Sequence, residues 1–195
     1  MSEKAFSLCG KFLIAMPGMG DQRFEKALIF LCAHSGEGAM GFIVNKTVES
    51  PSVPDFFEQL EIISSGERPK LPAEVLSKSL HVGGPVEPGR GFVLHSPEFT
   101  SESTLEVSDR VCLTATLDIL RAIAMGRGPE KSLLTLGYSG WSAGQLEGEI
   151  AANGWLTTDA DPNLLFSSAN ERKYDQSLKN LGVDPALLSS SAGRA

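Results

Sequence analysis

The feature that most constrains the fold is the stretch at residues 27–34, ALIFLCAH, which is apolar at every position except the last. A strand with one face in water alternates apolar and polar residues, whereas a strand covered on both faces is apolar throughout. A second apolar stretch follows at 39–45, after a turn that contains Gly36 and Gly38. The two stretches predict a β-hairpin whose first strand is covered on both faces.

Strands and helices interleave along the rest of the chain, with Gly and Pro at short intervals between them. Further strands are expected at 6–16, 79–83, 91–95, 104–107, 111–114, 132–138 and 155–158. Helices are expected at 52–63, 116–126, 143–152 and 170–181, with a short one after Asp161-Pro162. Because the hairpin breaks a pure βαβ rhythm, this order predicts an α/β (α+β) fold with a mixed β-sheet and helices around it.

The chain is expected to form a single domain. Its 195 residues match the length of one domain, which is about 100–200 residues. The sequence contains no internal repeat and no low-complexity linker long enough to separate two domains. Residues 1–188 are assigned to this domain, and the Ser- and Gly-containing residues 189–195 to a flexible C-terminal tail.

Two helices carry clear local signals. Ser52 and Asp55 have the spacing of a capping box at the start of the first helix. The polar stretch at 64–72, which follows that helix, is expected to be a loop. The last helix is expected to end at Gly182 and to bury one face. The residues of that face are Tyr174, Leu178 and Leu181.

Residues 137–141, GYSGW, form the junction that most suggests chemistry. A strand is expected to enter this Gly-rich turn and a helix to follow it, so free backbone N–H groups could hold an anion there. Ser142 and Gln145 have capping-box spacing, and Trp141 and Leu146 have the spacing of a hydrophobic staple. The competing interpretation is that the glycines permit a tight turn while Trp141 anchors the helix.

The charge balance argues against two classes of partner. The chain has 17 basic and 24 acidic residues, a net charge of −7, and its basic residues are scattered. Binding to nucleic acid usually needs several Lys or Arg on one face, because affinity comes largely from releasing counterions. Nucleic acid and membrane are therefore not the expected partners. No apolar run has the length of a signal-peptide core or a membrane span, so a cytoplasmic protein is expected.

The cysteines and histidines do not predict a metal site. Cys9, Cys32 and Cys112 are odd in number and widely spaced, which is typical of reduced, buried thiols. Cys32 and His34 lie on one face of the expected strand, but no second closely spaced pair accompanies them. His34, His81 and His95 are instead expected to make hydrogen bonds at strand ends. No metal and no cofactor is predicted.

Five groups of short segments resemble a known family in their order and spacing. They are 15–17 (AMP) with 24–26 (FEK), 41–46 (GFIVNK), 83–86 (GGPV) with 90–95 (RGFVLH), 137–147 (GYSGWSAGQLE) and 153–156 (NGWL). Over nearly its whole length the chain resembles the YqgE/AlgH family of uncharacterised bacterial proteins. The resemblance implies a single α/β domain whose sheet curls into a small barrel-like core surrounded by helices.

The resemblance brings no catalytic residues with it. One branch of the family has a name linked to the control of exopolysaccharide synthesis, which is the origin of the label "transcriptional regulator". The family pattern often has Ala where Ser139 stands here and Arg where Lys46 stands. The first difference weakens any role that needs a hydroxyl group at position 139.

The candidate binding residues come from the two Gly-rich segments, which are expected to flank a cleft for a ligand or partner. They are Gly83, Gly84, Arg90, Gly137, Tyr138, Gly140 and Trp141. Arg90, between two glycines, could approach a phosphate or carboxylate closely. The alternative is that Arg90 is solvated or paired with Glu87.

Ser139 with His95 and an acidic residue could in principle form a hydrolase triad. The segment reads G-x-S-G-W, however, so the second glycine comes one place earlier than in G-x-S-x-G. A serine in a turn or a cap accounts equally for this residue type. No catalytic residue is predicted.

Three hypotheses for function follow. The first is a non-enzymatic binding or regulatory protein that contacts another protein, because no complete catalytic constellation is present. The second is a small-ligand-binding protein or an enzyme that uses the Gly-rich cleft. The third is a DNA-binding transcriptional regulator, which rests on the family label and is opposed by the net charge of −7.

Overall fold

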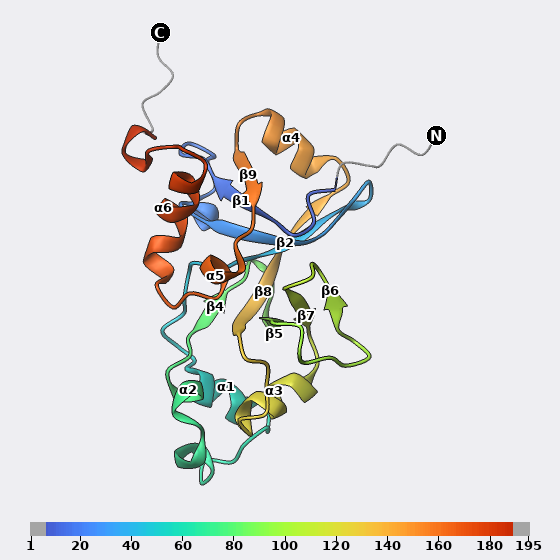
Figure 1. Ribbon diagram of the computed structural model, residues 1–195, viewed down its shortest axis with the longest axis vertical. Helices are drawn as coiled ribbons and strands as arrows, with labels where there is room; N and C mark the ends of the chain where they lie inside the picture. The colour runs from blue at the N-terminus through green and yellow to red at the C-terminus, as the bar shows by residue number, and fades with distance from the viewer. Residues whose placement is uncertain (1–6, 189–195) are drawn as a thin grey trace.

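One long strand, β8 (Ser132–Ser142), joins the two ends of the molecule in the computed structural model, which describes residues 7–188 (Figure 1). Its first half pairs antiparallel with β5 (Val86–His95) and parallel with β4 (Leu80–Val82). Its second half pairs antiparallel with β3 (Gly38–Ile43). All the strands of the sheet are thus connected through β8, in the order β6-β7-β5-β8-β3-β2-β1-β9 with β4 also on β8.

The remaining elements complete this sheet and cover it. The other strands are β1 (Lys11–Ala15), β2 (Leu28–Ser35), β6 (Leu105–Glu106), β7 (Cys112–Thr114) and β9 (Trp155–Asp159). The α-helices are α1 (Val53–Gln59), α2 (Ala73–Leu76), α3 (Leu117–Ala124), α4 (Gln145–Ala151), α5 (Pro162–Leu165) and α6 (Asn170–Asn180). Short 3₁₀ helices lie at Gln22–Phe24, Arg68–Lys70 and Pro185–Leu187. No helix within residues 7–188 has the length and apolar content needed to cross a bilayer.

The predicted hairpin is confirmed, and both faces of its first strand are covered. β2 and β3 pair antiparallel across a tight turn. Leu28 and Phe30 pack into a central cluster, whereas Ile29 and Leu31 pack into a second cluster on the opposite face. This division explains why the sequence of β2 is apolar without alternation.

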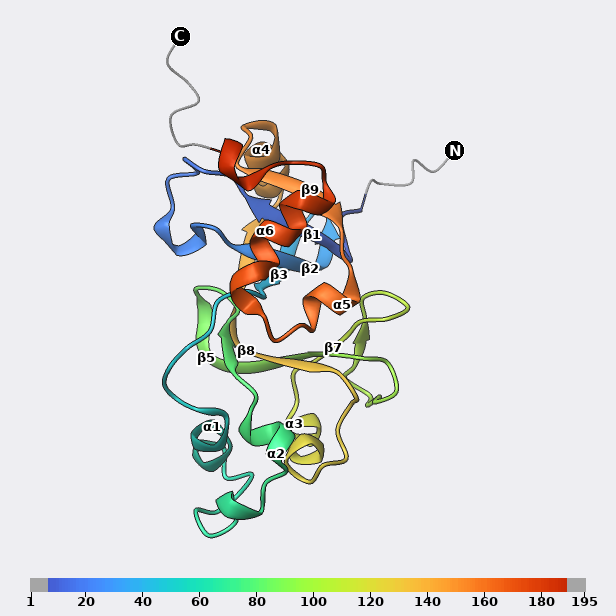
Figure 2. The same ribbon diagram turned by 60° about the vertical axis from the view of Figure 1, so that its left-hand side comes forward.

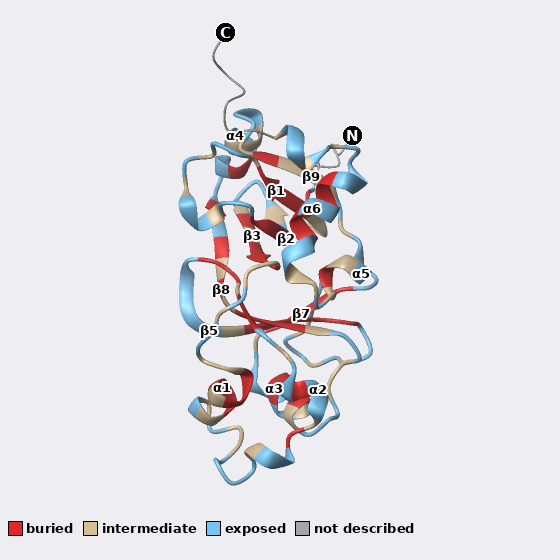
Figure 3. Cartoon of the chain, turned by 90° about the vertical axis from the view of Figure 1, so that its left-hand side faces the viewer, coloured by how far each residue is buried: buried red, intermediate tan, exposed pale blue. Residues whose placement is uncertain are grey.

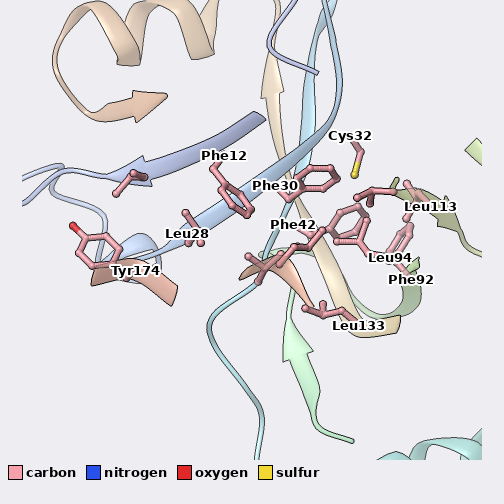
Figure 4. Packing of buried hydrophobic residues seen from close by; sticks show 14 of the residues in the cluster. Phe12, Leu28, Phe30, Cys32, Phe42, Phe92, Leu94, Leu113, Leu133 and Tyr174 are labelled. Carbon is pink, nitrogen blue, oxygen red and sulfur yellow. The ribbon is translucent and has the colours of Figure 1, made fainter. Parts of the chain in front are cut away.

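The sheet curls around the central cluster. Rings and aliphatic chains from β1, β2, β3, β5, β7 and β8 converge there (Figure 4). Phe42 and Phe92, from β3 and β5, lie 5.1 Å apart between ring centroids. The open side of the curl is closed by α5 and α6, which contribute Leu165, Tyr174 and Leu178. The Tyr174 hydroxyl donates a hydrogen bond of 2.6 Å to the carbonyl of Ala15.

The other helices cover the outer faces of the curl. α1, α2 and α3 gather at one end, beneath β5 and β8, and α4 lies at the opposite end (Figure 2). The buried residues accordingly fall in bands between helices and sheet (Figure 3). These observations confirm the expected fold class, a single-domain α+β fold with a mixed, curled sheet. The expected tail at 189–195 lies outside the described residues.

Several expected boundaries are wrong. β1 is shorter than the stretch 6–16, and the expected loop at 64–72 contains a 3₁₀ helix, with the unexpected α2 directly after it. β5 begins at Val86, because the turn-forming residues before Gly91 make an irregular strand with a register shift. Leu181 is 39% exposed, since α6 ends one residue before it and Gly182, at φ 76°, turns the chain away.

The expected turn at residues 137–141 is also wrong, because this whole segment belongs to β8. The residue that caps α4 is Gly144, in the left-handed conformation at φ 74°, and no side chain caps it. The Gln145 side chain still accepts a hydrogen bond of 3.0 Å from the backbone of Ser142. Ser142 is nevertheless a strand residue, so neither the capping box nor the hydrophobic staple forms in the expected register.

The two Gly-rich segments meet where the chain crosses β8. β4 and β5 pair with opposite edges of β8 at the same residues, so the connection between them must pass over that strand. The backbone amide of Gly83 donates to the carbonyl of Leu136 at 2.8 Å. A Cβ atom on Gly137, at φ 70°, would lie 2.6 Å from the carbonyl oxygen of Gly84 and 2.8 Å from that of Val86. The glycines therefore permit a backbone crossing that side chains would block.

The interior also contains a lysine without a carboxylate partner among residues 7–188. Lys173, on α6, is fully buried, and its Nζ donates to the carbonyl of Val44 at 2.9 Å. Burial lowers the pKa of Lys173 to about 8 from 10.5, because the charged form loses its hydration. Burial also lowers the pKa of His81, and the nearby Lys173 charge adds to that effect.

The crossing makes one prediction. The substitution Gly137→Ala is expected to lower the free energy of unfolding by roughly 2–4 kcal/mol, because backbone strain adds to overpacking. Gly144→Ala is the matched control, since Gly144 has a similar φ of 74° and no atom within 4 Å of its Cβ position. It should cost only about 1 kcal/mol. Urea unfolding measures both values, and equal losses would contradict the role given to the crossing.

Lys173 makes a second prediction. Its pKa is about 8 in the native state, against 10.5 for the free side chain, so the unfolded chain binds more protons between these values. The free energy of unfolding should therefore rise with pH across this window, by about 3 kcal/mol in total. Lys173→Met should lack this rise. Urea unfolding of both proteins from pH 7 to 10 tests it, and a difference independent of pH would refute the assignment.

Candidate functional site

A cavity of about 680 Å³ lies beside the two tryptophans of the chain. Its walls come from the loop after β1, the end of β8, α4, the start of β9 and the 3₁₀ helix near residue 187. We call it the tryptophan groove. Its lining includes the side chains of Met16, Met19, Phe24, Trp141, Glu149 and Trp155. A neighbouring cavity, also of about 680 Å³, shares the residues 16–19 with it.

One carboxylate holds the two indoles in place. Glu149, on α4, accepts hydrogen bonds through Oε2 from Nε1 of Trp141 at 2.9 Å and from Nε1 of Trp155 at 2.8 Å. Its Oε1 accepts from the side chain of Gln145 at 3.0 Å. Both buried indole donors are therefore satisfied by a charged acceptor, and such hydrogen bonds are stronger than neutral ones.

The aromatic side chains form a row along the groove. The rings of Trp141 and Trp155 meet edge to face, with centroids 5.9 Å apart, and those of Phe24 and Trp155 do so at 5.7 Å. This geometry is favoured by the quadrupoles of the rings. The two tryptophans are more than nine-tenths buried, so the row is a rigid wall. Met16 and Met19 line the same cavity with flexible apolar side chains.

The charged rim of the groove is paired internally. Arg23 donates to Asp21 at 2.7 Å through a terminal nitrogen and at 3.0 Å through Nε. The hydrogen bond from Arg23 lowers the pKa of Asp21. The Arg23 guanidinium also lies 5.8 Å from the ring centroid of Phe24, within cation–π range. Because Asp21 and Arg23 are paired with each other, neither side chain is free to act as an acid or a base.

The lining of the groove contains apolar, amide and paired charged groups. None of the described residues that line it is a serine, cysteine, histidine or lysine. Its carboxylates, Asp21 and Glu149, already accept hydrogen bonds from Arg23 and from the two indoles. The arrangement is therefore suited to binding a ligand of mixed apolar and polar character.

The structure separates the candidate residues drawn from the sequence. Gly140 and Trp141 line the tryptophan groove, and together with Tyr138 they line a shallow surface on which His34 also lies. Arg90 lines neither region; it stacks over the ring of Phe92 at 4.9 Å and reaches Glu87 at 3.4 Å.

The three other glycines serve the crossing over β8. Gly83, Gly84 and Gly137 lie in the backbone contact between β8 and the connection from β4 to β5. None of them lines either region described above. The two Gly-rich segments consequently touch each other, where the sequence had suggested a cleft between them.

Ser139 and His95 do not meet. Ser139 is fully buried and donates to the carbonyl of Gly83 at 3.1 Å. His95 pairs with Ser132, seven residues before Ser139 on β8, and its ring bonds to Thr114 and to the carbonyl of Ser96. A serine without solvent access and without a histidine beside it cannot act as a nucleophile.

The other histidines also have local partners. His34 binds the backbone of Leu8 at 3.0 Å and Glu147 at 2.7 Å. His81 lies elsewhere, against Asn170 and the carbonyl of Leu134. Within residues 7–188 no group of three or more His, Cys, Asp or Glu side chains could hold a metal ion.

Sequence reasoning missed most of the groove. Glu149, Met19 and the residues near 187 were not among the candidates, because they come together only in the folded chain. One signal was available. The loop Met16-Pro17-Gly18-Met19 places two large apolar side chains in a turn rich in Gly and Pro, where polar residues are usual.

Comparisons with known proteins agree on one family. The AlgH-like family model matches residues 12–186. A UPF0301 protein of Methylobacterium nodulans is 55% identical over 189 residues, which cover 96% of this chain and 90% of the relative. A UPF0301 protein of Bradyrhizobium diazoefficiens is 56% identical over 189 residues, covering 96% and 88%.

Solved structures show the same fold. The solution structure of the AlgH protein from Pseudomonas aeruginosa matches with a TM-score of 0.79 and 39% identity, over 100% of both chains. An X-ray crystal structure of a Corynebacterium diphtheriae protein matches with a TM-score of 0.69 at 17% identity, over 96% of this chain and 92% of that one. The second match supports the fold alone.

The two hydrogen bonds that Glu149 accepts from the indoles, here called the clamp, make a prediction. Glu149→Ala leaves the Nε1 donors of Trp141 and Trp155 without an acceptor, so the free energy of unfolding should fall by about 2–3 kcal/mol. Tryptophan emission should shift to longer wavelength, because the freed indole N–H groups would turn to water. The signal reports on this site, since Trp141 and Trp155 are the two tryptophans of the chain. Glu147→Ala, on the same helix but paired only with His34, is the control and should leave the emission unchanged. Identical spectra for all three proteins would contradict the clamp.

Proposed function

The chain belongs to the AlgH-like family, and on that premise we propose that it is a non-enzymatic binding and regulatory protein whose tryptophan groove holds a segment of another protein. The family assignment agrees with the resemblance carried by the five groups of short segments. The observation that carries the proposal is the lining of the groove. It combines a rigid aromatic wall, flexible methionines and a paired charged rim, and none of the lining residues that the structure describes is a free nucleophile or base.

This composition is typical of protein-binding surfaces. Trp, Met and Arg are enriched in the cores of protein interfaces, and free charges are depleted there. Side chains that a partner inserts into a well-packed pocket, Trp, Tyr and Arg above all, often supply most of the binding energy. Met16 and Met19 add surface that can adjust to a partner's shape. A partner segment with a large apolar side chain would fill the groove and cover this surface.

The position of the groove gives a second line of support. Four of the five groups of segments that carry the family resemblance contribute to its lining: Met16, Pro17 and Phe24; Pro85; Gly140, Trp141 and Gln145; and Asn153, Gly154 and Trp155. The residues of these segments that pack in the core have a structural reason to be there. The residues of these segments at the rim face the groove, and a role in binding would account for their presence there.

A small molecule is the second candidate occupant. The volume of about 680 Å³ falls within the roughly 300–1,000 Å³ of small-molecule sites. A thermal-shift screen against metabolites separates the two candidates. A ligand at one hundred times its Kd should raise the free energy of unfolding by about 2.7 kcal/mol.

Regulation through protein contacts is favoured over DNA binding. The net charge of −7 opposes binding to phosphates, and the groove has acidic groups at its rim and floor. A regulatory protein of this kind would act in the cytoplasm by binding a partner, and any effect on transcription would be indirect.

The proposal predicts that one charge in the groove abolishes partner binding. Met19→Glu puts a carboxylate into the apolar wall, where a partner would have to bury it unpaired. Partner retained from a bacterial lysate on the immobilised protein should fall at least about ten-fold. The purified partner should shift the tryptophan emission of the wild-type protein and leave that of the variant unchanged.

Met125→Glu is the matched control. Met125 is 67% exposed directly after α3, at the far end of the molecule, and it does not line the groove. This variant should retain the partner as the wild-type protein does. Equal retention by all three proteins would show that binding occurs elsewhere, and failure to retain any partner would count against the proposal itself.

A further inference from the structure

A polar cavity of about 310 Å³ lies where β4, β8 and the start of α6 meet, away from the tryptophan groove and from the cavity next to it. Its polar lining includes Lys78, His81, Ser132, Ser167, Ser168 and Asn170, and one carboxylate, that of Glu74, also lines it. Its lining is therefore rich in hydroxyl, amide and basic groups, in contrast to the aromatic groove. No residue lines both cavities.

Lys78 brings a charge that the fold does not neutralise. It lies two residues after α2 and is partly buried. Its backbone N–H donates to the carbonyl of Val75, but within residues 7–188 its Nζ has no hydrogen-bond or ion-pair partner. Burial lowers the pKa of Lys78, and the carboxylate of Glu74, which lines the same cavity, acts in the opposite direction. A partly desolvated ammonium group without a partner gains free energy when an anion reaches it.

Ser132 brings an unused hydroxyl group. Its Oγ is buried and has no hydrogen-bond partner among the described residues, although Ser132 sits in the regular pairing of β8 with β5. Buried polar atoms are almost always hydrogen-bonded, so an exception calls for an explanation. Ser132 lines the cavity and is as a residue only partly buried, so a rotation of its side chain would bring this hydroxyl group to a ligand with acceptor oxygens.

His81 and Asn170 form the rigid floor. His81 is 6% exposed, and its Nδ1 lies 3.2 Å from the carbonyl of Leu134. Its Nε2 lies 3.0 Å from the side-chain oxygen of Asn170, the first residue of α6. Burial lowers the pKa of His81, while its hydrogen bonds to these two oxygens act in the opposite direction and favour the protonated ring, which donates from both nitrogens. An anion nearby would further stabilise this form, against the opposing charge of Lys173.

The N-terminal end of α6 adds partial positive charge to the cavity. The residue that caps it is Ala169, which provides no side-chain hydrogen bond to the first turn. Helix N-termini favour anions. The backbone N–H groups of Asn170 and Arg172 already donate to the carbonyls of Ser168 and Ala169, so this end contributes chiefly through the helix dipole. Ser167 and Ser168 precede this end and line the cavity. Lys78, Ser132 and the helix end thus converge from three separate elements.

We propose that this polar cavity binds the phosphate group of a small phosphomonoester. A phosphate presents several acceptor oxygens, which match one ammonium group and several hydroxyl groups better than a carboxylate does. The volume of about 310 Å³ is at the small end of the range for metabolite sites, about 300–1,000 Å³. The ligand is therefore of the size of a triose or glycerol phosphate. The proposal is independent of the function assigned to the tryptophan groove.

Glycerol 3-phosphate is the probe for the test, with inorganic phosphate, acetate and chloride at equal ionic strength beside it. The readouts are the imidazole resonances of His81 in heteronuclear NMR spectra and the thermal midpoint of unfolding. The two phosphates should shift the His81 resonances along saturable curves. Acetate and chloride should not.

Variants assign the binding to the cavity. Lys78→Gln should weaken the binding of glycerol 3-phosphate at least about ten-fold, as expected for the loss of a charge-assisted hydrogen bond. Ser132→Ala should also weaken it without lowering stability, because it removes an unsatisfied buried hydroxyl. Glu74→Gln, which removes the opposing charge, should strengthen binding. Lys70→Gln, an exposed lysine that does not line the cavity, is the control and should bind as the wild-type protein does.

Three results would overturn the proposal. The first is an absence of any saturable His81 shift up to tens of millimolar of either phosphate. The second is equal weakening by Lys78→Gln and Lys70→Gln, which would indicate general charge attraction. The third is binding of acetate as tight as that of glycerol 3-phosphate, which would remove the phosphate assignment. The groove variant Met19→Glu should leave phosphate binding unchanged, so the two proposals fail separately.

Discussion

The structure depends on the backbone crossing of β8 by the connection between β4 and β5. β8 belongs to both halves of the molecule, because β3 pairs with its second half and β4 and β5 with its first. The chain can pass from one edge of β8 to the other only where the two backbones come close, at Gly83, Gly84 and Gly137. This contact aligns the three hydrophobic clusters, since the central cluster lies between the two halves and the others lie outside them.

The parts of the fold that depend on local pattern could be predicted from the sequence. The unbroken apolar run of β2 indicated a strand covered on both faces, and its two faces do lie in different clusters. The capping box of Ser52 and Asp55 forms as expected. The glycines at 137 and 140 were wrongly interpreted as a turn. A glycine in a sequence indicates that the backbone needs conformational freedom or space, but it does not indicate the cause. At Gly137 the reason is the neighbouring backbone of Gly84 and Val86, which no local pattern reveals.

The candidate site was less predictable for the same reason. The tryptophan groove is assembled from segments near residues 16, 141, 155 and 187, which only the pairing of β1 with β9 and the position of α4 bring together. Trp141 was singled out from the sequence, both as a staple for a helix and as a candidate binding residue. Its actual partner, Glu149, faces both indoles from α4. The polar cavity around Lys78 likewise has walls from three elements distant in sequence.

The pairing of β1 with β9 has a consequence for the synthesis of the chain. Lys11 pairs with Asp159, so the outer edge of β1 has no partner until most of the chain has left the ribosome. At about 5–20 residues per second, the intervening 148 residues (159 minus 11) take roughly 7–30 s to translate. During that time an apolar strand presents unpaired N–H and C=O groups to other nascent chains. A chaperone that shields this edge would protect the protein most while the ribosome is still translating it.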